Sequence, residues 1–90
     1  MEKREILERF SGAEQSMNVV PVLPLIELLG DRRLLVENHR GILLYGRDEI
    51  EVKLTIGTLC VVGCGLCIAY MSKHRLVING TVKSLSISRM

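Results

Sequence analysis

The sequence has few aromatic residues and no strong charge of either sign. Its 90 residues contain no tryptophan, and aromatic residues make up only 3% of the chain (Phe10, Tyr45 and Tyr70). Nucleic-acid binding usually needs a basic face or aromatic rings on which bases stack, and a net charge of +2 with so few rings supplies neither. We therefore expect no nucleic-acid partner. The core must be built from Leu, Ile and Val, of which Val and Ile favour strands.

The N-terminus lacks the pattern of an export signal. Its first five residues, which include Lys3 and Arg4, are mostly charged, and neither an uninterrupted apolar run nor a small-residue cleavage site follows them. We expect a cytoplasmic protein. In that compartment the three cysteines are predicted to be reduced thiols and not a disulfide framework.

The length and the 48% apolar content suit one small domain with one modest core. Residues 1–18 are predicted to form a short helix, which ends near Phe10, followed by a linker. Residues 19–90 are predicted to form a single β domain. Its first segment is apolar but interrupted by Pro21 and Pro24, which remove backbone donors, so an edge strand or an extended arm fits best.

Period-two alternation predicts strands in the rest of the chain. It is clearest where the apolar side chains from Ile50 to Ile56 alternate with polar ones. Glycine-containing turns, among them those expected at residues 63–65 and at Asn79–Gly80, follow every eight to twelve residues or so. The spacing between Val82 and Leu85 predicts a β-bulge. We expect an all-β fold, a small antiparallel β-sandwich of about seven short strands with the short N-terminal helix. A short β-solenoid is the alternative.

Residues 54–72 contain no formal charge, and this length is enough for a transmembrane helix. However, the stretch contains Gly57, Gly63 and Gly65, is rich in β-branched residues and continues the alternation that begins at Ile50. Two buried strands joined by a turn at residues 63–65 explain these features better than a membrane span does.

The cysteines have a spacing that resembles a metal-binding motif. Cys60, Cys64 and Cys67 form a C-x3-C-x2-C pattern of the kind that holds iron–sulfur clusters in radical enzymes, and His74 could complete a zinc site. Ninety residues cannot form the large barrel that a radical enzyme needs. Alternation along a strand can also turn Cys60 and Cys67 to different faces. We predict no metal and no cofactor, with these four residues as the candidates if the prediction is wrong.

The segment around His39 is a polar corner between two apolar strands. His39 and Glu37 could suggest acid–base chemistry, but no nucleophile has an obvious place beside them and the sequence has no phosphate-binding loop. A turn whose side chains bond backbone groups is the better interpretation. Asn38, Arg40 and Gly41 are therefore predicted to be a structural corner, Asn38 and Gly41 because they tolerate left-handed backbone conformations. We predict no catalytic residues and no small-molecule substrate.

Five segments, taken in order, resemble the YabP/YqfC family of bacterial sporulation proteins, and its YqfC branch most closely. They comprise residues 23–30, residues 36–42 followed by Tyr45, residues 56–59, residues 62–68 and residues 78–82. The resemblance covers most of the chain from Leu23 to Ile87, and the three cysteines are not part of it.

The resemblance implies a small β-sandwich made in the mother cell of an endospore-forming bacterium and needed for spore formation or coat assembly. It implies no catalytic residues. The expected partner is another sporulation protein, for which a membrane protein is a reasonable guess, and the expected place is the mother-cell cytoplasm, peripheral to the outer forespore membrane.

Two functional hypotheses follow. In the first, the protein is a non-enzymatic scaffold that presents a sheet face or edge for protein–protein interaction. The proline-bearing segment would prevent strand pairing at one edge of the sheet, so the opposite edge is the candidate contact. A homo-oligomer remains an open alternative. In the second, the chain is a small metal or redox module that uses Cys60, Cys64 and Cys67.

Overall fold

The computed structural model describes residues 23–89, and within them the fold is all-β, as the sequence predicts. The predicted N-terminal helix lies outside the described residues. Six strands follow one another along the chain: β1 (Leu25–Leu29), β2 (Arg33–Glu37), β3 (Ile42–Tyr45), β4 (Glu49–Leu54), β5 (Gly57–Met71) and β6 (Arg75–Arg89). Within residues 23–89 there is no helix long and apolar enough to cross a membrane.

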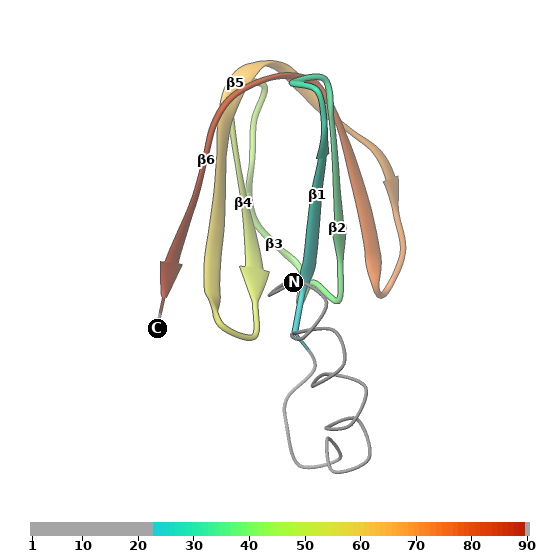
Figure 1. The fold of residues 1–90 in the computed structure, drawn as a ribbon, viewed down its shortest axis with the longest axis vertical. Coiled ribbons are helices and arrows are strands. Elements are labelled where there is room, and N and C mark those ends of the chain that lie inside the picture. Colours follow the sequence, from blue (N-terminus) through green and yellow to red (C-terminus); the bar gives the residue numbers. More distant parts are fainter. Residues whose placement is uncertain (1–22, 90) are drawn as a thin grey trace, which may run out of the picture.

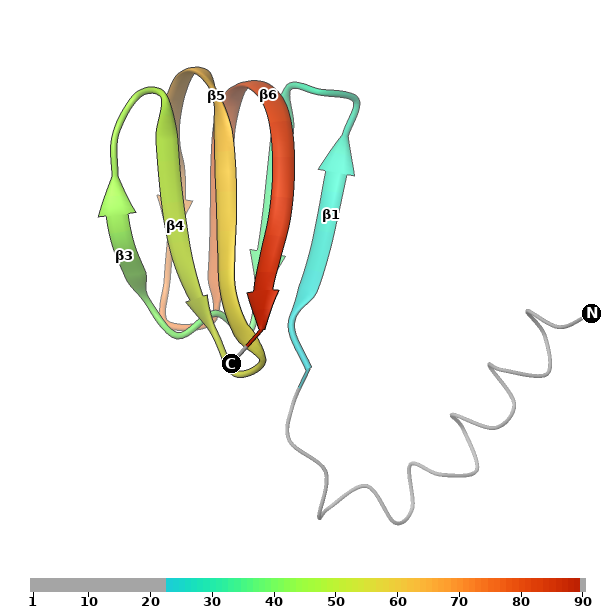
Figure 2. The ribbon, with the colours of Figure 1, turned by 90° about the vertical axis from the view of Figure 1, so that its left-hand side faces the viewer.

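The six strands form one antiparallel sheet in the order β1-β2-β6-β5-β4-β3. Its centre is a hairpin of two 15-residue strands, β5 and β6, which bend together so that the sheet folds over itself (Figure 1). The β3–β4 layer contains β3, β4, residues 57–62 of β5 and residues 82–89 of β6. The β1–β2 layer contains β1, β2, residues 75–79 of β6 and residues 66–71 of β5. Figure 2 looks onto the β3–β4 layer, with β2 and the other halves of β5 and β6 behind it.

The core lies between the two layers, and the alternation of the sequence explains why. In β4, Ile50, Val52 and Leu54 are buried while the residues between them are partly or fully exposed. Cross-strand partners share a face, so the same pattern continues into the neighbouring strands. The buried apolar residues form a single cluster: Leu34, Val36, Ile50, Val52, Leu54, Leu59, Val61, Leu66, Leu76, Ile78 and Val82.

Two glycines allow the long hairpin to bend. A Cβ atom added to Gly63 would lie 2.0 Å from the carbonyl oxygen of Thr81, and one added to Gly80 would lie 2.7 Å from that of Gly65. Gly80 also has a φ of 133°, which an L side chain rarely adopts. The backbones of β5 and β6 therefore approach each other more closely at the bend than any side chain permits.

The described residues form six strands instead of the expected seven or so, and two of the expected turns are bends within long strands. The sequence predicted reversals at residues 63–65 and at Asn79–Gly80, but β5 and β6 continue through both and remain paired on either side. The stretch of residues 54–72 is accordingly the end of β4 and all of β5. The predicted bulge is confirmed: Val62 pairs with Ser84 and Gly63 pairs with Val82, which leaves Lys83 as the extra residue.

The turns of the two short hairpins hold the bend in place. In the β3–β4 turn the carbonyl oxygens of Arg47 and Asp48 accept hydrogen bonds from Leu66 (2.8 Å) and Gly63 (2.9 Å) of β5. The β1–β2 turn does the same for β6, where Val82 donates to the carbonyl oxygen of Asp31 at 2.7 Å. Each short hairpin therefore pairs with one long strand and also fixes the bend of that strand.

We expect Gly63→Ala to destabilise the fold much more than Gly65→Ala. Gly63 lacks a positive φ, so the substitution tests the close approach to Thr81 alone, and overpacking of this kind costs roughly 3 kcal/mol or more. Gly65 has a φ of 62° and open space around its Cβ position, so alanine there should cost only about 1–2 kcal/mol. Urea unfolding measures both, and equal transition midpoints would contradict the proposed role of Gly63.

Candidate functional site

The corner at residues 38–41 joins β2 of one layer to β3 of the other and is hydrogen-bonded to both. Asn38 donates its backbone N–H to the carbonyl oxygen of His74 at 2.6 Å, and its side chain bonds the carbonyl oxygen of Leu23 at 3.1 Å. On the other side, Arg40 donates its backbone N–H to the carbonyl oxygen of Lys53 at 2.7 Å. Asn38 has a φ of 66° and Gly41 one of 120°, so the corner uses the left-handed conformations that these two residue types tolerate.

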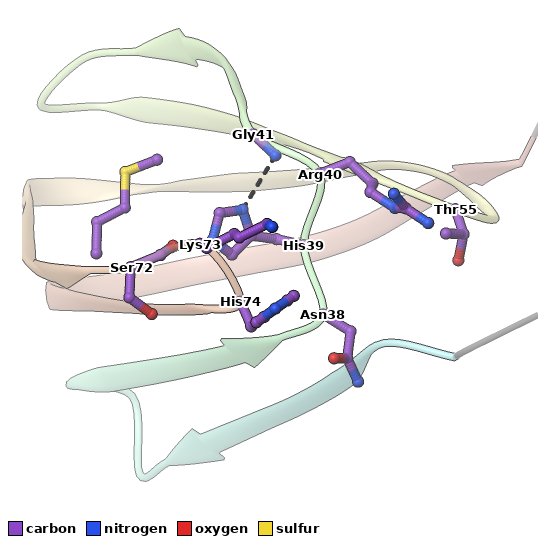
Figure 3. Close-up of a pocket in the computed structure, with 9 residues that line it drawn as sticks. Asn38, His39, Arg40, Gly41, Thr55, Ser72, Lys73 and His74 are labelled. Carbon is purple, nitrogen blue, oxygen red and sulfur yellow. Dashed lines mark hydrogen bonds between the residues drawn. The ribbon is translucent and has the colours of Figure 1, made fainter.

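His39 is buried in this corner, and both of its ring nitrogens are occupied. Only 5% of the residue is exposed. Its Nδ1 accepts a hydrogen bond from the backbone N–H of Gly41 at 3.0 Å (Figure 3). Its Nε2 therefore carries the proton and donates to the carbonyl oxygen of Ser72 at 2.9 Å. The imidazole therefore bonds backbone groups, as the sequence predicts for this turn, and has no free nitrogen for a metal ion or a substrate.

Glu37, the other member of the acid–base pair considered from the sequence, bonds elsewhere. Its carboxylate accepts hydrogen bonds from the guanidinium group of Arg75 at 2.6 and 3.1 Å. This ion pair lies on the outer face of the sheet, whereas the ring of His39 is buried in the corner. The structure therefore gives the two residues separate partners.

A shallow hollow opens around the corner and the β5–β6 turn (Figure 3). Its charged lining residues are Arg40 and Lys73, and His74 contributes a further imidazole, while no acidic residue lines it. Nothing in the sequence shows that the β5–β6 turn, at residues 72–74, meets this corner. Chemically the hollow can attract an anion, but its one buried titratable side chain, His39, is committed to backbone groups.

We expect His39→Ala to lower the free energy of unfolding by about 2–4 kcal/mol. The substitution removes buried side-chain volume and leaves the N–H of Gly41 and the carbonyl oxygen of Ser72 without their partner. His74→Ala is the matched control, because His74 is exposed in the β5–β6 turn and lines the same hollow, and it should change stability by no more than about 0.5 kcal/mol. Chemical denaturation compares the two variants. Similar losses in the free energy of unfolding would argue against a stabilising role for the buried His39 ring.

The structure does not bring the cysteines and His74 together. Cys60 lies on the outer face of the β3–β4 layer, whereas Cys67, beyond the bend, pairs with Asn79 in the β1–β2 layer. Among residues 23–89 the three side chains that do converge on ligand distances are those of Glu49, Glu51 and Cys60, all partly exposed.

Cys60 is held as a thiol in this group. Its Sγ donates a hydrogen bond to Oε2 of Glu49 at 3.2 Å. This hydrogen bond, together with partial burial and the charges of Glu49 and Glu51, raises the pKa of Cys60 above its ordinary value. A raised pKa leaves less thiolate, which is the form that binds metals and reacts with electrophiles.

Alkylation with iodoacetamide at pH 8 should therefore modify Cys60 more slowly than Cys64 or Cys67, both of which are exposed. Because the hydrogen bond to Glu49 is the main cause of the raised pKa, Glu49→Ala should accelerate the reaction at Cys60 and leave the other two rates unchanged. Peptide mass spectrometry over a time course gives the three rates. Fastest reaction at Cys60 in the unaltered protein would contradict this assignment.

The outer face of the β1–β2 layer carries an apolar surface that the sequence analysis did not identify. Cross-strand pairs place Leu35 beside Val77 and Val77 beside Tyr70, all on the side of the sheet away from the core. Leu25 and Leu29 of β1 point the same way, because Ile26 between them pairs with the buried Val36. We call these five residues the leucine face. Leu29 is 69% exposed and Tyr70 is 54% exposed.

The outer face of the β3–β4 layer is different. There the cross-strand partners are Glu49 with Val62, Glu51 with Cys60, and Lys53 with Thr58, and β6 contributes three serines. Leu44 of β3 lies beside Glu51 on this face, so its exposed apolar residues are set among charged and polar ones. The sequence did contain one signal for the contrast between the two faces. Leu34, Leu35 and Val36 are consecutive apolar residues, so β2 is apolar on both sides, whereas β4 alternates.

Comparisons with known proteins agree with the resemblance seen in the sequence. The model of the YabP family matches residues 24–89, which include almost all of the described fold. The chain is also similar to the uncharacterized protein YqfC of Bacillus subtilis (strain 168), with 29% identity over 65 residues, or 72% of this chain and 70% of that protein. No solved structure matches the chain.

Proposed function

This chain belongs to the YabP family, and we propose that it is a non-enzymatic sporulation protein that acts in the mother cell. It serves as a scaffold in spore formation or coat assembly, and it binds another sporulation protein at the outer forespore membrane. The observation that carries the proposal is the leucine face, which is an exposed apolar surface. It lies on the outer side of the sheet, while the inner side is already buried between the two layers.

The leucine face has the arrangement of a protein-binding surface. Its centre is the apolar row of Leu35, Val77 and Tyr70. The surroundings are polar, because Glu37 and Arg75 form an ion pair on one side, Arg33 donates to Asn79 at 3.1 Å on the other, and Glu27 of β1 lies beside Leu35. An apolar centre with aromatic and aliphatic anchors inside a polar rim is typical of protein interfaces.

The polar groups of the corner support a scaffold better than an enzyme. The ring of His39 and the carboxylate of Glu37 are bonded to groups of the protein itself. In the described part of the chain no buried side-chain nitrogen or oxygen lacks a hydrogen-bond partner, so no buried polar atom there is left to bind a substrate. The alternative function, a cysteine-based metal or redox module, has weaker support because Cys60 and Cys67 lie in different layers.

The proposal is tested in the endospore-forming host by a deletion strain complemented with tagged versions of the protein. We expect deletion to reduce the number of heat-resistant spores, and the tagged wild type to restore them and to gather around the forespore in the mother cell. Diffuse signal in growing cells, together with normal spores after deletion, would contradict a role in sporulation.

The double variant Leu29→Asp/Tyr70→Asp tests the leucine face in the same strain. Both residues are largely exposed, so the fold should persist, while two carboxylates in the apolar surface should abolish partner binding, forespore localisation and spore recovery. Val62→Asp is the matched control, because Val62 is 38% exposed on the other outer face. Full complementation by the double variant would exclude the leucine face as the contact surface.

A further inference from the structure

Folding one sheet over itself gives each layer two edges, and one of the four edges differs from the rest. In the described part of the chain the edges are β1, β3, residues 66–71 of β5 and residues 82–89 of β6. An edge strand exposes unpaired backbone groups, and proteins usually protect it with proline, charge, bulges or short length.

Three of the edges carry such protection. β1 follows Pro24 and has Glu27 at its centre, and β3 has only four residues with a register shift after Ile42. The second half of β5 contains two register shifts, and the hydroxyl of Tyr45 accepts a hydrogen bond from the backbone N–H of Ile68 at 3.4 Å.

The second half of β6 has no such protection between its ends. From Ser84 to Ser88 the strand has no proline, no charge and no register shift, and it alternates serine with Leu85 and Ile87. The serines face outward, because Ser86 pairs with Cys60 on the outer face. Leu85 and Ile87 share the inner face with their partners Val61 and Leu59, yet Ile87 is 45% exposed. This edge is therefore an apolar seam that the described chain leaves open.

The hydrogen-bonding pattern shows which backbone groups face outward along this edge. The backbone N–H of Gly63 donates to the carbonyl oxygen of Asp48. In an antiparallel sheet, the backbone groups of successive residues point to opposite neighbours. Every second residue of β5 from Gly57 to Gly63 therefore bonds to β4, and the residues between them bond to β6. It follows that Ser84, Ser86 and Ser88 bond to β5. The backbone N–H and C=O groups of Leu85 and Ile87 then point away from the sheet, toward the open side.

We propose that this edge binds the same edge of a second copy, in an antiparallel pairing whose twofold axis passes through Ser86. In this register Leu85 of each copy exchanges two backbone hydrogen bonds with Ile87 of the other, and their apolar side chains lie side by side on the inner face. On the outer face Ser86 meets Ser86, and Ser84 meets Ser88. In this register the strand is therefore complementary to a second copy of itself in its backbone donors and acceptors and in the side chains of both faces.

Charge limits the extent of the pairing. Lys83 and Arg89 lie at the two ends of the segment, and in this register each lies opposite the other in the second copy. Like charges in such positions repel, so the contact is confined to residues 84–88. A five-residue edge contact should give a reversible dimer that becomes tighter as salt screens the repulsion.

Disulfide trapping tests the register. In the full chain with Cys60, Cys64 and Cys67 replaced by Ser, Ser86→Cys should form a covalent dimer rapidly in a glutathione redox buffer. Ser86 faces its counterpart in a non-hydrogen-bonded pair, where the Cα atoms are close enough for a disulfide. Ser84→Cys alone and Ser88→Cys alone should dimerise slowly, whereas a mixture of these two variants should form the mixed disulfide as rapidly as Ser86→Cys does.

Analytical ultracentrifugation tests the dimer without cysteines. The wild type should show a monomer–dimer equilibrium that shifts toward dimer at higher salt, and Ile87→Lys should be monomeric with unchanged circular dichroism. Leu29→Lys, on the leucine face, is the control and should dimerise like the wild type.

A wild type that is monomeric at every concentration would overturn the proposal, as would trapping of Ser86→Cys no faster than trapping of Ser84→Cys alone. Either result would mean that a second copy does not pair with this edge in the proposed register. The proposed sporulation role does not depend on this outcome, because that role rests on the leucine face and is tested in spores.

Discussion

The close approach of two backbones at Gly63 and Gly80 is the constraint on which the rest of the structure depends. A Cβ atom at these positions would lie 2.0 and 2.7 Å from carbonyl oxygens of the adjacent strand, so only glycine lets β5 and β6 bend together while they stay paired. Because both strands bend, a single sheet of six strands covers its own inner face. No second sheet and no helix is needed to bury that face within residues 23–89.

The two outer faces derive from the same side of one sheet, and their difference is therefore informative. Packing of the core requires nothing of either face, since both lie away from it. One face intersperses Leu44 and Val62 with serines and glutamates, while the other presents Leu35, Val77 and Tyr70 in an uninterrupted row. This asymmetry does nothing for the folding of the domain, and it is the main structural reason for assigning the leucine face to partner binding.

Local patterns in the sequence were sufficient to predict the strand class, the bulge at Lys83 and the left-handed backbone conformations of Asn38 and Gly41. They did not reveal the bend. A glycine between apolar residues is compatible with a reversal or with a continuous strand, and the choice depends on whether β6 follows β5 on both sides of Gly63. The separation of Cys60 from Cys67 has the same origin. Alternation suggested that the two thiols point to different faces, but both lie on the outer side of the sheet, and it is the bend that places them in different layers.

The bend also changes the environment of each long strand along its length. β6 lies between β2 and β5 up to Asn79, and beyond Val82 it is an edge. Its composition changes at the same point, from the buried residues Leu76 and Ile78 to the serine-rich alternation that ends at Arg89. One strand therefore meets two demands, since an interior strand must fill a core whereas an edge strand must manage unpaired backbone groups. A sequence that satisfies both in turn specifies where the sheet folds and where it remains open to a partner.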